Sequence, residues 1–426
     1  MLYYMRCEYN SGSACPVIRE ASMYLTYTVL FLILLIFIWG ISFSGRGKIH
    51  EDYLSRDIMM SMRGLAAIGV IIHHISQEEV FQTAGELAPF VNAGYMYVSL
   101  FFFCSGYGLL KNLDTKPGYL EGFLKKRLPV IVIPFYTSVV FYGIYNLIAG
   151  VHLAPLQWFT NIIGITMMNE YAWYPIVLAI LYLAFRLIFK GNATRTRKLV
   201  YMFIVIIALG VIFCVNGHYL WWAGSEAWTS PMSSELDSKW YMGFKVFWFS
   251  GEWWVNSPVA FLLGMIYETN EARITDFFRK GYPAKIIVLA ILTIASDVLT
   301  NYTRARFDFW SEYYLPGPGI ANKMITLVTQ YPHIILFTLF IIVFTMKIRT
   351  VNPVTRFFGK YSLDFYMMNL MALLIFRPLF LDFPGRITKD PLLGRSLFFV
   401  CVFAASILLG MIYHRINEVI RRKLFG

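Results

Sequence analysis

Long apolar segments are the feature that most limits what this chain of 426 residues can fold into. A helix of about 20 consecutive, mainly apolar residues spans a lipid bilayer. The sequence contains eleven such candidates, which cover residues 23–43, 60–77, 94–111, 128–150, 172–190, 199–218, 246–267, 284–302, 331–347, 361–380 and 396–414. Little chain remains for a water-soluble domain. We therefore predict an all-α, polytopic membrane helix bundle of about eleven transmembrane helices.

The composition supports this fold class. Hydrophobic residues make up 58% of the chain and charged residues 15%, whereas soluble globular proteins carry about 25% charged residues. The formal net charge is +12, but the cations gather in short loops, where they face the cytoplasm and anionic lipid. No basic patch is interleaved with aromatic residues on a polar surface. The lipid bilayer is thus an expected partner and nucleic acid is not.

The positions of the cations predict the orientation in the membrane. Cation-rich segments are residues 44–58, 111–127, 190–198, 268–285, 347–360 and the C-terminal tail. They alternate with loops poorer in cations, such as residues 77–93. Because positively charged loops stay in the cytoplasm, we predict an outer N-terminus and a cytoplasmic C-terminus. The first span is interpreted as an uncleaved anchor, since it lacks a convincing signal-peptide cleavage site; a signal peptide is the alternative.

Cysteines and histidines show no metal-binding pattern. The five cysteines are scattered, at Cys7, Cys15, Cys104, Cys214 and Cys401. The first two can pair if the N-terminus lies outside, and a free pair is equally compatible with the sequence. His73 and His74 are adjacent, so they face different sides of a helix, and no third ligand follows at a suitable spacing. No metal is expected.

Residues 219–257 hold seven of the eleven tryptophans, together with several carboxylates. An aromatic belt at the membrane interface explains this enrichment. The alternative is an acceptor platform, in which tryptophan faces stack on sugar rings and carboxylates bind sugar hydroxyls. The sequence does not decide between the two.

The segment "MRGLAAIGVIIHH" at residues 62–74 combines two candidate functional residues, Arg63 and His74. On a helix they lie about 16 Å apart along the axis and face the same side. Arginine binds anionic groups through charge-assisted hydrogen bonds, and histidine accepts a proton from a hydroxyl near neutral pH. The small residues between them let neighbours approach closely. The pair suits acyl transfer from a long anionic donor. A buried structural histidine and an orientation-setting arginine are the alternatives, because the spacing alone is not specific.

Four later segments add motifs in a fixed order. They are "VSLFFFCSGYGLL" at 98–110, "GFLKKRLPVIVIPFY" at 122–136, "AWYPIVLAILYL" at 172–183 and "FGKYSLDFYMMNL" at 358–370. Together with the Arg63 and His74 helix, this ordered set resembles the acyltransferase-3 family of integral-membrane acyltransferases. The resemblance covers about residues 56–415.

The resemblance implies roles for individual residues. His74 matches the family's catalytic histidine, and Arg63 matches its essential partner, which holds or orients the acyl donor. Candidates for donor binding are Ser105, Lys125, Lys126 and Arg127. Weaker candidates for acceptor binding are Trp173, Tyr174, Tyr361, Ser362 and Asn369. Helix packing, membrane orientation and interfacial location are the alternative explanations for these two groups.

Three features depart from the family pattern. The second cation of the basic element would fall at Val130, so Lys125, Lys126 or another loop residue must replace it. The family often has a histidine where this chain has Asn369, which cannot shuttle protons near pH 7. The span at 23–43 is additional to the family's usual ten.

The function implied is that of an O-acyltransferase in a bacterial cytoplasmic membrane. It would move an acyl group, with acetyl expected, from cytoplasmic acyl-CoA to a hydroxyl of a cell-envelope carbohydrate or lipid-linked glycan, with His74 as the general base. Acyl-CoA, with acetyl-CoA expected, is the only co-substrate implied.

The predicted organisation has three parts. Residues 1–55 form an outer segment, an anchor helix and a loop, residues 56–415 the acyltransferase domain, and residues 416–426 a basic cytoplasmic tail. A transporter or exporter of a small molecule or glycan is the main alternative, although no inverted repeat supports it. A membrane sensor or scaffold is the third hypothesis. The acceptor and the oligomeric state are not specified by the sequence.

Overall fold

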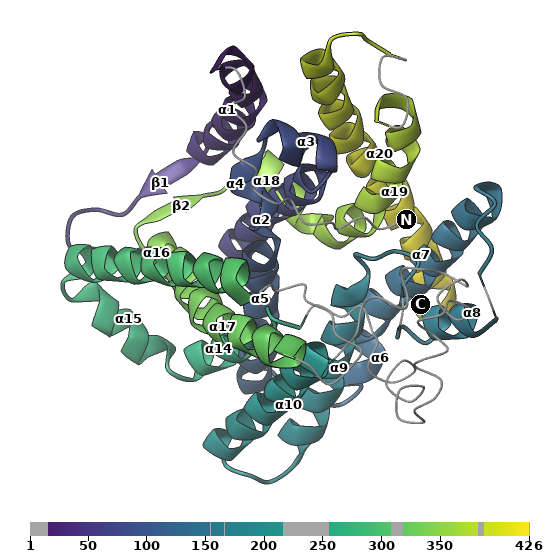
Figure 1. Ribbon diagram of the computed structural model, residues 1–426. Coiled ribbons are helices and arrows are strands. Elements are labelled where there is room, and N and C mark those ends of the chain that lie inside the picture. The colour runs from purple at the N-terminus through teal and green to yellow at the C-terminus, as the bar shows by residue number, and fades with distance from the viewer. Residues whose placement is uncertain are drawn as a thin grey trace. The chain divides into compact units, whose positions relative to one another are not determined.

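The computed structural model describes residues 16–153, 155–165, 167–215, 255–307, 318–381 and 387–425. Its elements are α1 (Pro16–Ile38), β1 (Ile41–Phe43), α2 (Arg56–Ser76), α3 (Glu79–Ala84), α4 (Ala88–Val91), α5 (Gly94–Thr115), α6 (Phe123–Arg127), α7 (Pro129–Ile148), α8 (Pro155–Ile162), α9 (Trp173–Lys190), α10 (Arg195–Val215), α14 (Val259–Thr269), α15 (Glu271–Arg279), α16 (Tyr282–Phe307), α17 (Pro318–Thr345), β2 (Ile348–Thr350), α18 (Pro353–Lys360), α19 (Ser362–Phe380) and α20 (Pro391–Phe425). Helices dominate the described chain (Figure 1), which confirms the predicted all-α class.

Each of the eleven predicted spans contains part of a described helix. Seven described helices are long and apolar enough to cross a bilayer, namely α2, α7, α9, α16, α17, α19 and α20, and α1 and α14 contain shorter apolar stretches. The tryptophan-rich segment lies outside the described residues up to residue 254, as do Cys7 and Cys15. The chain is therefore a polytopic membrane protein.

The end of the first predicted span, at residues 39–43, is wrong as a helix. Helix α1 ends at Ile38, and residues 41–43 form β1, which pairs with β2 in antiparallel register. Gly40 causes the break: its φ of +80° is left-handed, a conformation that glycine adopts without strain. The pairing joins the segments that follow α1 and α17. Residues 44–58 and 347–360 were predicted to be cytoplasmic loops; β1 directly precedes the first of them, and β2 lies in the second.

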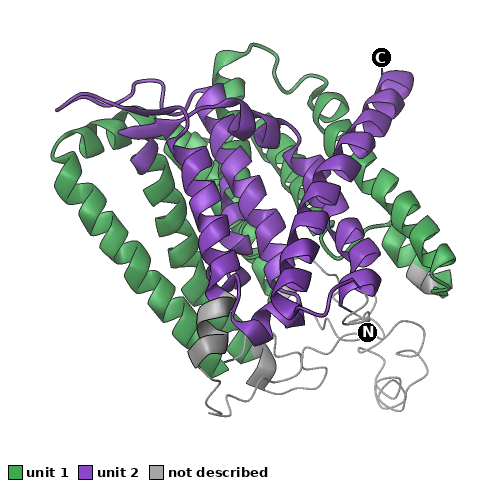
Figure 2. Ribbon diagram, turned by 90° about the horizontal axis from the view of Figure 1, so that it is seen from above, with its two compact units in different colours: residues 1–2, 101–343 green, residues 3–100, 344–426 purple. Residues whose placement is uncertain are grey.

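The described chain divides into two compact units (Figure 2). Of the described residues, those within 101–343 form unit 1, and those within 16–100 and 344–425 form unit 2. The boundaries fall within α5 and α17. Unit 2 thus contains α1 to α4, both strands and α18 to α20, whereas unit 1 contains α6 to α10 and α14 to α16.

In unit 2, α18 packs closely against α2 because two glycines face the contact. A Cβ atom at Gly64 would overlap the carbonyl oxygen of Thr355, and one at Gly359 would overlap that of Met60. The hydroxyl groups of Ser61 and Thr355 form a hydrogen bond across the same contact. The expectation that small residues in α2 permit close approach is confirmed at this crossing.

Replacing Gly64 with alanine is expected to destabilise the protein. The added methyl group meets backbone, which cannot rotate away, and overpacking of this kind costs about 1–3 kcal/mol. Gly108→Ala is the matched control, because nothing lies within 4 Å of a Cβ at that helical position. Thermal unfolding in detergent should show a lower midpoint for Gly64→Ala only. Equal midpoints for the two variants would contradict the tight crossing.

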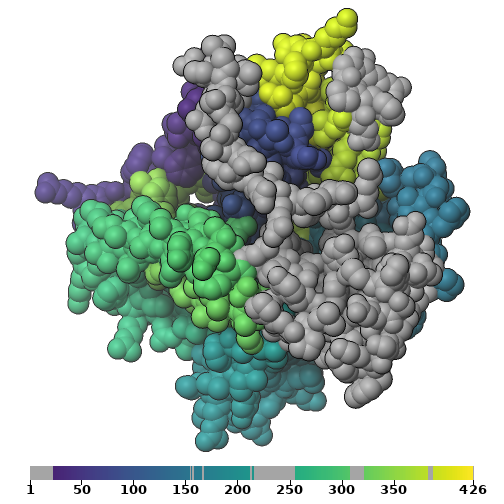
Figure 3. Space-filling view, in the orientation of Figure 1, coloured from purple at the N-terminus to yellow at the C-terminus, as the bar shows by residue number. Residues whose placement is uncertain are grey.

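In unit 1, α16 and α17 combine an exposed apolar face with a polar seam. Ile291, Ile294 and Val298 of α16 are each about 60% exposed, and the helix forms part of the surface visible in Figure 3. Ser296 hydrogen-bonds His333 of α17 at 2.9 Å. Hydrogen bonds between polar side chains hold neighbouring membrane helices together. This pattern fits helices that face lipid on one side.

Candidate active site

Helix α2 carries both Arg63 and His74, as predicted. It runs without interruption from Arg56 to Ser76, so the expected separation of about 16 Å along one helix face holds. The side chain of His74 is buried, with 7% of its surface exposed. His74 is therefore an interior histidine of unit 2, and its hydrogen bonds decide which ring nitrogen carries the proton.

A chain of hydrogen bonds orients His74. Its Nδ1 lies 2.7 Å from Oδ1 of Asn369 in α19. The Asn369 amide nitrogen donates to Oγ of Ser406 in α20 at 2.9 Å, and the Ser406 hydroxyl donates to the carbonyl oxygen of Val402 at 2.7 Å. The Ser406 hydroxyl uses its proton in the bond to Val402, so its oxygen can only accept a hydrogen bond from Asn369. The NH₂ group of Asn369 therefore faces Ser406, and its Oδ1 faces His74. The neutral imidazole then carries its proton on Nδ1 and its lone pair on Nε2.

The neighbouring histidine lies in a different environment. His73 Nδ1 donates to the carbonyl oxygen of Phe90 in α4 at 2.8 Å. A Cβ atom at Gly94 would overlap the His73 ring, so the start of α5 lies directly against this side chain. The two histidine rings are 5.3 Å apart, and Tyr366 of α19 lies 6.0 Å from His74. The His73 ring thus lies next to the His74 ring.

Arg63 is a partly buried cation. Its Nε is buried and has no hydrogen-bond partner among the described residues. The adjacent Gly64 touches α18, so this part of α2 is closely covered. A buried N–H group without a partner costs free energy comparable to a lost hydrogen bond. The Nε–H group of Arg63 therefore retains an unused capacity to donate a hydrogen bond.

The donor-binding candidates lie in unit 1. Ser105 of α5 hydrogen-bonds the Tyr182 hydroxyl of α9 at 3.0 Å. Beside it, a Cβ atom at Gly106 would overlap the carbonyl oxygen of Phe261, so the Ser-Gly pair lies at a close helix contact. Helix α6 contains Lys125, Lys126 and Arg127. The two lysines are exposed, and Arg127 donates to the Tyr119 hydroxyl at 2.8 Å.

The acceptor-binding candidates are divided between the two units: Trp173 and Tyr174 belong to unit 1, and the other three belong to unit 2. In unit 1, Trp173 is buried and stacks on Phe102, whose ring lies 4.9 Å from Tyr174. In unit 2, the Ser362 hydroxyl donates to the carbonyl oxygen of Gly359 at 3.2 Å, and Tyr361 precedes the same helix. Among these five candidates, Asn369 is the one for which the structure gives a contact with His74.

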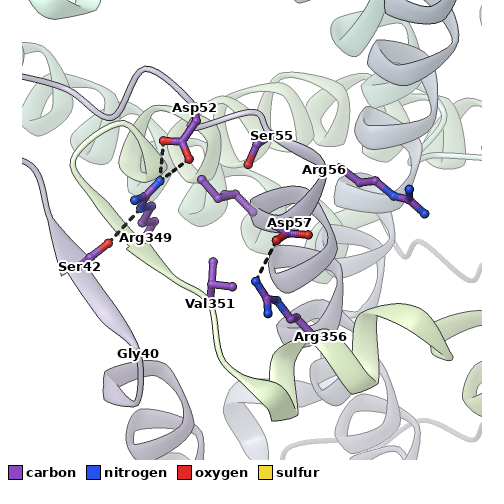
Figure 4. A pocket seen from close by; sticks show the side chains of 10 residues that line it. Gly40, Ser42, Asp52, Ser55, Arg56, Asp57, Arg349, Val351 and Arg356 are labelled. Carbon is purple, nitrogen blue, oxygen red and sulfur yellow. Dashed lines mark hydrogen bonds and ion pairs between the residues drawn. The ribbon is translucent and has the colours of Figure 1, made fainter.

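A polar pocket of about 640 Å³ lies where β1, β2 and the start of α2 meet in unit 2 (Figure 4). Arg349 binds both carboxylate oxygens of Asp52, and Arg356 pairs with Asp57 at 2.8 Å. Figure 4 shows Arg56 directed away from both carboxylates. Exposed pairs of this kind contribute about 0–1 kcal/mol each. They join the segment before α2 to β2 and the first turn of α2 to α18. No predicted site residue lines the pocket.

A comparison with known families identifies the domain. The acyltransferase-3 family model, described as an acyltransferase domain, matches residues 59–415. The chain belongs to this family. Neither the curated proteins nor the solved structures gave a match. The protein is therefore a membrane acyltransferase of the class that transfers groups other than aminoacyl groups, and the resemblance inferred from its ordered motifs is confirmed.

Two ion pairs with buried carboxylates hold residues 77–93 of the acyltransferase in place. Glu78 binds Arg377 of α19 at 2.6 Å, and Glu86 binds Arg395 of α20 at 2.8 Å. Both pairs use two guanidinium nitrogens, the geometry of strong charge-assisted hydrogen bonds. The segment that contains α3 and α4 is thus held against the two helices that contribute Asn369 and Ser406.

Sequence reasoning missed two polar contacts in this unit. Ser406 lies in an apolar stretch with no motif that suggests a role. His414 of α20 lies 2.8 Å from a carboxylate oxygen of Asp364 in α19 and 4.7 Å from the Tyr361 ring. The partners are 50 residues apart in the sequence, so no local spacing indicates the pair. Among the described residues, no group of three His, Cys, Asp or Glu side chains could hold a metal ion.

Replacing Asn369 with leucine is expected to lower kcat of the acyltransferase by about 10- to 100-fold, because leaving a buried polar group unsatisfied costs about 1–3 kcal/mol. The His74 ring would lose the acceptor for its Nδ1 proton and hence its fixed tautomer. Asn301→Leu is the control, since Asn301 is exposed on α16. Steady-state kinetics would check this; an unchanged kcat in Asn369→Leu would show that the contact with Asn369 is not needed for activity.

Proposed function

We propose that the acyltransferase moves an acyl group, with acetyl as the first candidate, from cytoplasmic acyl-CoA to a hydroxyl of a cell-envelope carbohydrate or lipid-linked glycan. The observation that carries this proposal is the His74–Asn369–Ser406 chain, which directs the Nε2 lone pair of a buried histidine away from Asn369. It supports His74 as the general base for a hydroxyl acceptor.

The proposed reaction is a direct transfer. His74 Nε2 accepts the proton of the acceptor hydroxyl as its oxygen attacks the carbonyl carbon of the thioester. A new ester C–O bond forms, the C–S bond breaks, and the CoA thiolate leaves with the proton that His74 returns. The His74 ring is positively charged after it has accepted the proton and before it returns it. Asn369 stabilises this charged ring, because its Oδ1 accepts a hydrogen bond from Nδ1–H in both states of the ring.

Arg63 is proposed to hold the donor. Its buried, unpartnered Nε supports this role, since guanidinium groups bind anions and polarised carbonyl groups through charge-assisted hydrogen bonds. The donor is proposed to extend along α2 between Arg63 and His74. Lys125 and Lys126 are exposed on α6 and remain proposed contacts for the phosphates of CoA, with Arg127 and Ser105.

The cellular setting completes the proposal. We further propose that the acyltransferase lies in a bacterial cytoplasmic membrane, with its N-terminus outside and its C-terminus in the cytoplasm. The pairing of β1 with β2 supports the proposed sidedness, because it requires the segments after α1 and α17 to lie on one side. Trp173, Tyr174, Tyr361 and Ser362 remain proposed acceptor contacts.

Labelled acyl transfer tests the proposed function. The purified protein would be incubated with acetyl-CoA labelled in the acetyl group and with a mixed extract of envelope glycans. We expect the label to appear in carbohydrate and to be released from it by mild base, because an ester is hydrolysed under these conditions. The His74→Ala variant is the control and should transfer no label. Absence of transfer from acetyl-, succinyl- and longer acyl-CoA, together with absence of acyl-CoA binding, would contradict the proposal.

A further inference from the structure

Helix α1 lies outside the family match, which begins at residue 59, and yet it belongs to the unit that contains His74. One face of α1 is buried in that unit, where Leu25, Thr26 and Val29 are each at most 8% exposed. Tyr27 on another face is 60% exposed. A helix that served only as a membrane anchor would need no buried polar side chain, and Thr26 is such a side chain.

The Thr26 hydroxyl binds the loop that precedes α4. Its Oγ1 accepts a hydrogen bond from the backbone N–H of Leu87 at 2.9 Å, and both residues are almost fully buried. Leu87 has a φ of +57°, and it is the only described residue other than glycine with a positive φ. Such a conformation is strained for a leucine and persists only when its surroundings hold it. Thr26 supplies part of that support.

The same turn carries the partner of His73. Leu87 directly precedes α4, and the carbonyl oxygen of Phe90 in α4 accepts the Nδ1 proton of His73 at 2.8 Å. His73 in turn lies beside the His74 ring, at a centroid distance of 5.3 Å. A continuous path of contacts therefore leads from Thr26 through α4 to the two histidines.

The C-terminal end of α1 is also anchored. The Asn352 amide nitrogen donates to the carbonyl oxygens of Ile36 and Trp39 at 2.8 Å and 2.7 Å. Asn352 also caps α18, the helix that packs on α2 beside Arg63. Helix α1 is thus held near its middle, through Thr26, and at its C-terminal end, through these carbonyl groups. Its position relative to α4 is thereby set.

We propose that Thr26 is a positioning residue of the acyltransferase: through Leu87 and α4 it holds His73, and through His73 it holds the ring of His74. This inference rests on the proposed role of His74 as the general base. It makes the additional N-terminal helix a part of the catalytic unit. A purely structural role for Thr26 would affect stability without changing the catalytic behaviour of the histidine.

Three variants of the full-length protein test this role. Thr26→Val keeps the shape of the side chain and removes the acceptor, whereas Thr26→Ser keeps the acceptor. Thr28→Val is the matched control, because Thr28 is exposed on the same helix. For each variant we would measure kcat, the KM for acyl-CoA, the pH profile of kcat and the thermal midpoint. Hydrogen–deuterium exchange at the imidazole C2 of His73 and His74 gives a readout that does not depend on activity.

We expect Thr26→Val to lower kcat about 3- to 10-fold, in line with the loss of one buried hydrogen bond, with a displaced pH profile and little change in KM. Thr26→Ser and Thr28→Val should behave like the wild type. A wild-type kcat and pH profile in Thr26→Val would overturn the proposal, and so would an equal loss of kcat in Thr28→Val.

An inactive wild-type protein would contradict the proposed function, and the imidazole exchange would then decide about Thr26. Altered C2 exchange at His73 and His74 in Thr26→Val, with unchanged exchange in Thr28→Val, would support the positioning role. Identical exchange in the two variants would overturn it. The failure of one proposal is thus distinguishable from the failure of the other.

Discussion

Replacing His74 with alanine or glutamine is expected to reduce kcat of acyl transfer by about 10²- to 10⁴-fold, the usual contribution of a general base. The reason is chemical, because neither side chain accepts a proton from a hydroxyl near neutral pH. Binding of acyl-CoA should change little, since the proposed contacts for its charged groups are Arg63 and the basic residues of α6. The measurement is transfer of labelled acetyl to glycan, in parallel with equilibrium binding of acetyl-CoA.

The control for His74 is His152→Ala. His152 is an exposed histidine between α7 and α8, so its loss should leave kcat unchanged. Glutamine at position 74 retains a polar side chain in the buried site and guards against a variant that fails to fold. If the folded His74→Gln protein kept kcat within about threefold of the wild type, general-base catalysis by this residue would be excluded, because the usual contribution is far larger.

Replacing Arg63 with alanine is expected to lower kcat/KM for acyl-CoA by about 10- to 150-fold, which corresponds to the 1.5–3 kcal/mol of a hydrogen bond to a charged group. Most of the effect should appear in the KM for the donor. Arg63→Lys should not restore activity, because the orphaned atom is Nε and lysine has no counterpart for it. Steady-state kinetics with varied acyl-CoA would measure this.

The lysine variant separates donor binding from membrane orientation. If Arg63 served only to set orientation, any cation would serve, and Arg63→Lys would behave like the wild type. Arg415→Ala is the matched control in the same unit, since its side chain is 74% exposed. Full activity in Arg63→Lys would therefore support the orientation role and contradict the donor role.

The fold class followed from the sequence because span length is a local property. An apolar run of about 20 residues is long enough for a membrane helix whatever surrounds it, and each predicted span contains described helix. The β1–β2 pair was not predicted. Each strand has three residues, which is too short to show a period of two, and the strands lie about 300 residues apart in the chain. The break at Gly40 was not predicted either, because glycine is also common inside membrane helices.

The candidate site was predictable in part. Arg63 and His74 could be placed on one helix face because helical periodicity links residues eleven apart in the sequence. Asn369 was singled out by its motif, but as an acceptor contact. Its hydrogen bond to His74 joins residues 295 apart, and no local pattern encodes such a pair. The same holds for Ser406, whose position in an apolar helix gave no signal.

The sequence by itself determined that this chain forms a bundle of membrane helices, which family it resembles and which helix carries the histidine and arginine. These properties depend on residue type and on spacing along one helix. Only the tertiary structure decided which ring nitrogen of His74 is protonated, that Arg63 Nε lacks a partner and that Thr26 contacts the turn before α4. Those facts depend on how separate helices pack and in which register, because hydrogen bonds form between whichever side chains the packing brings together.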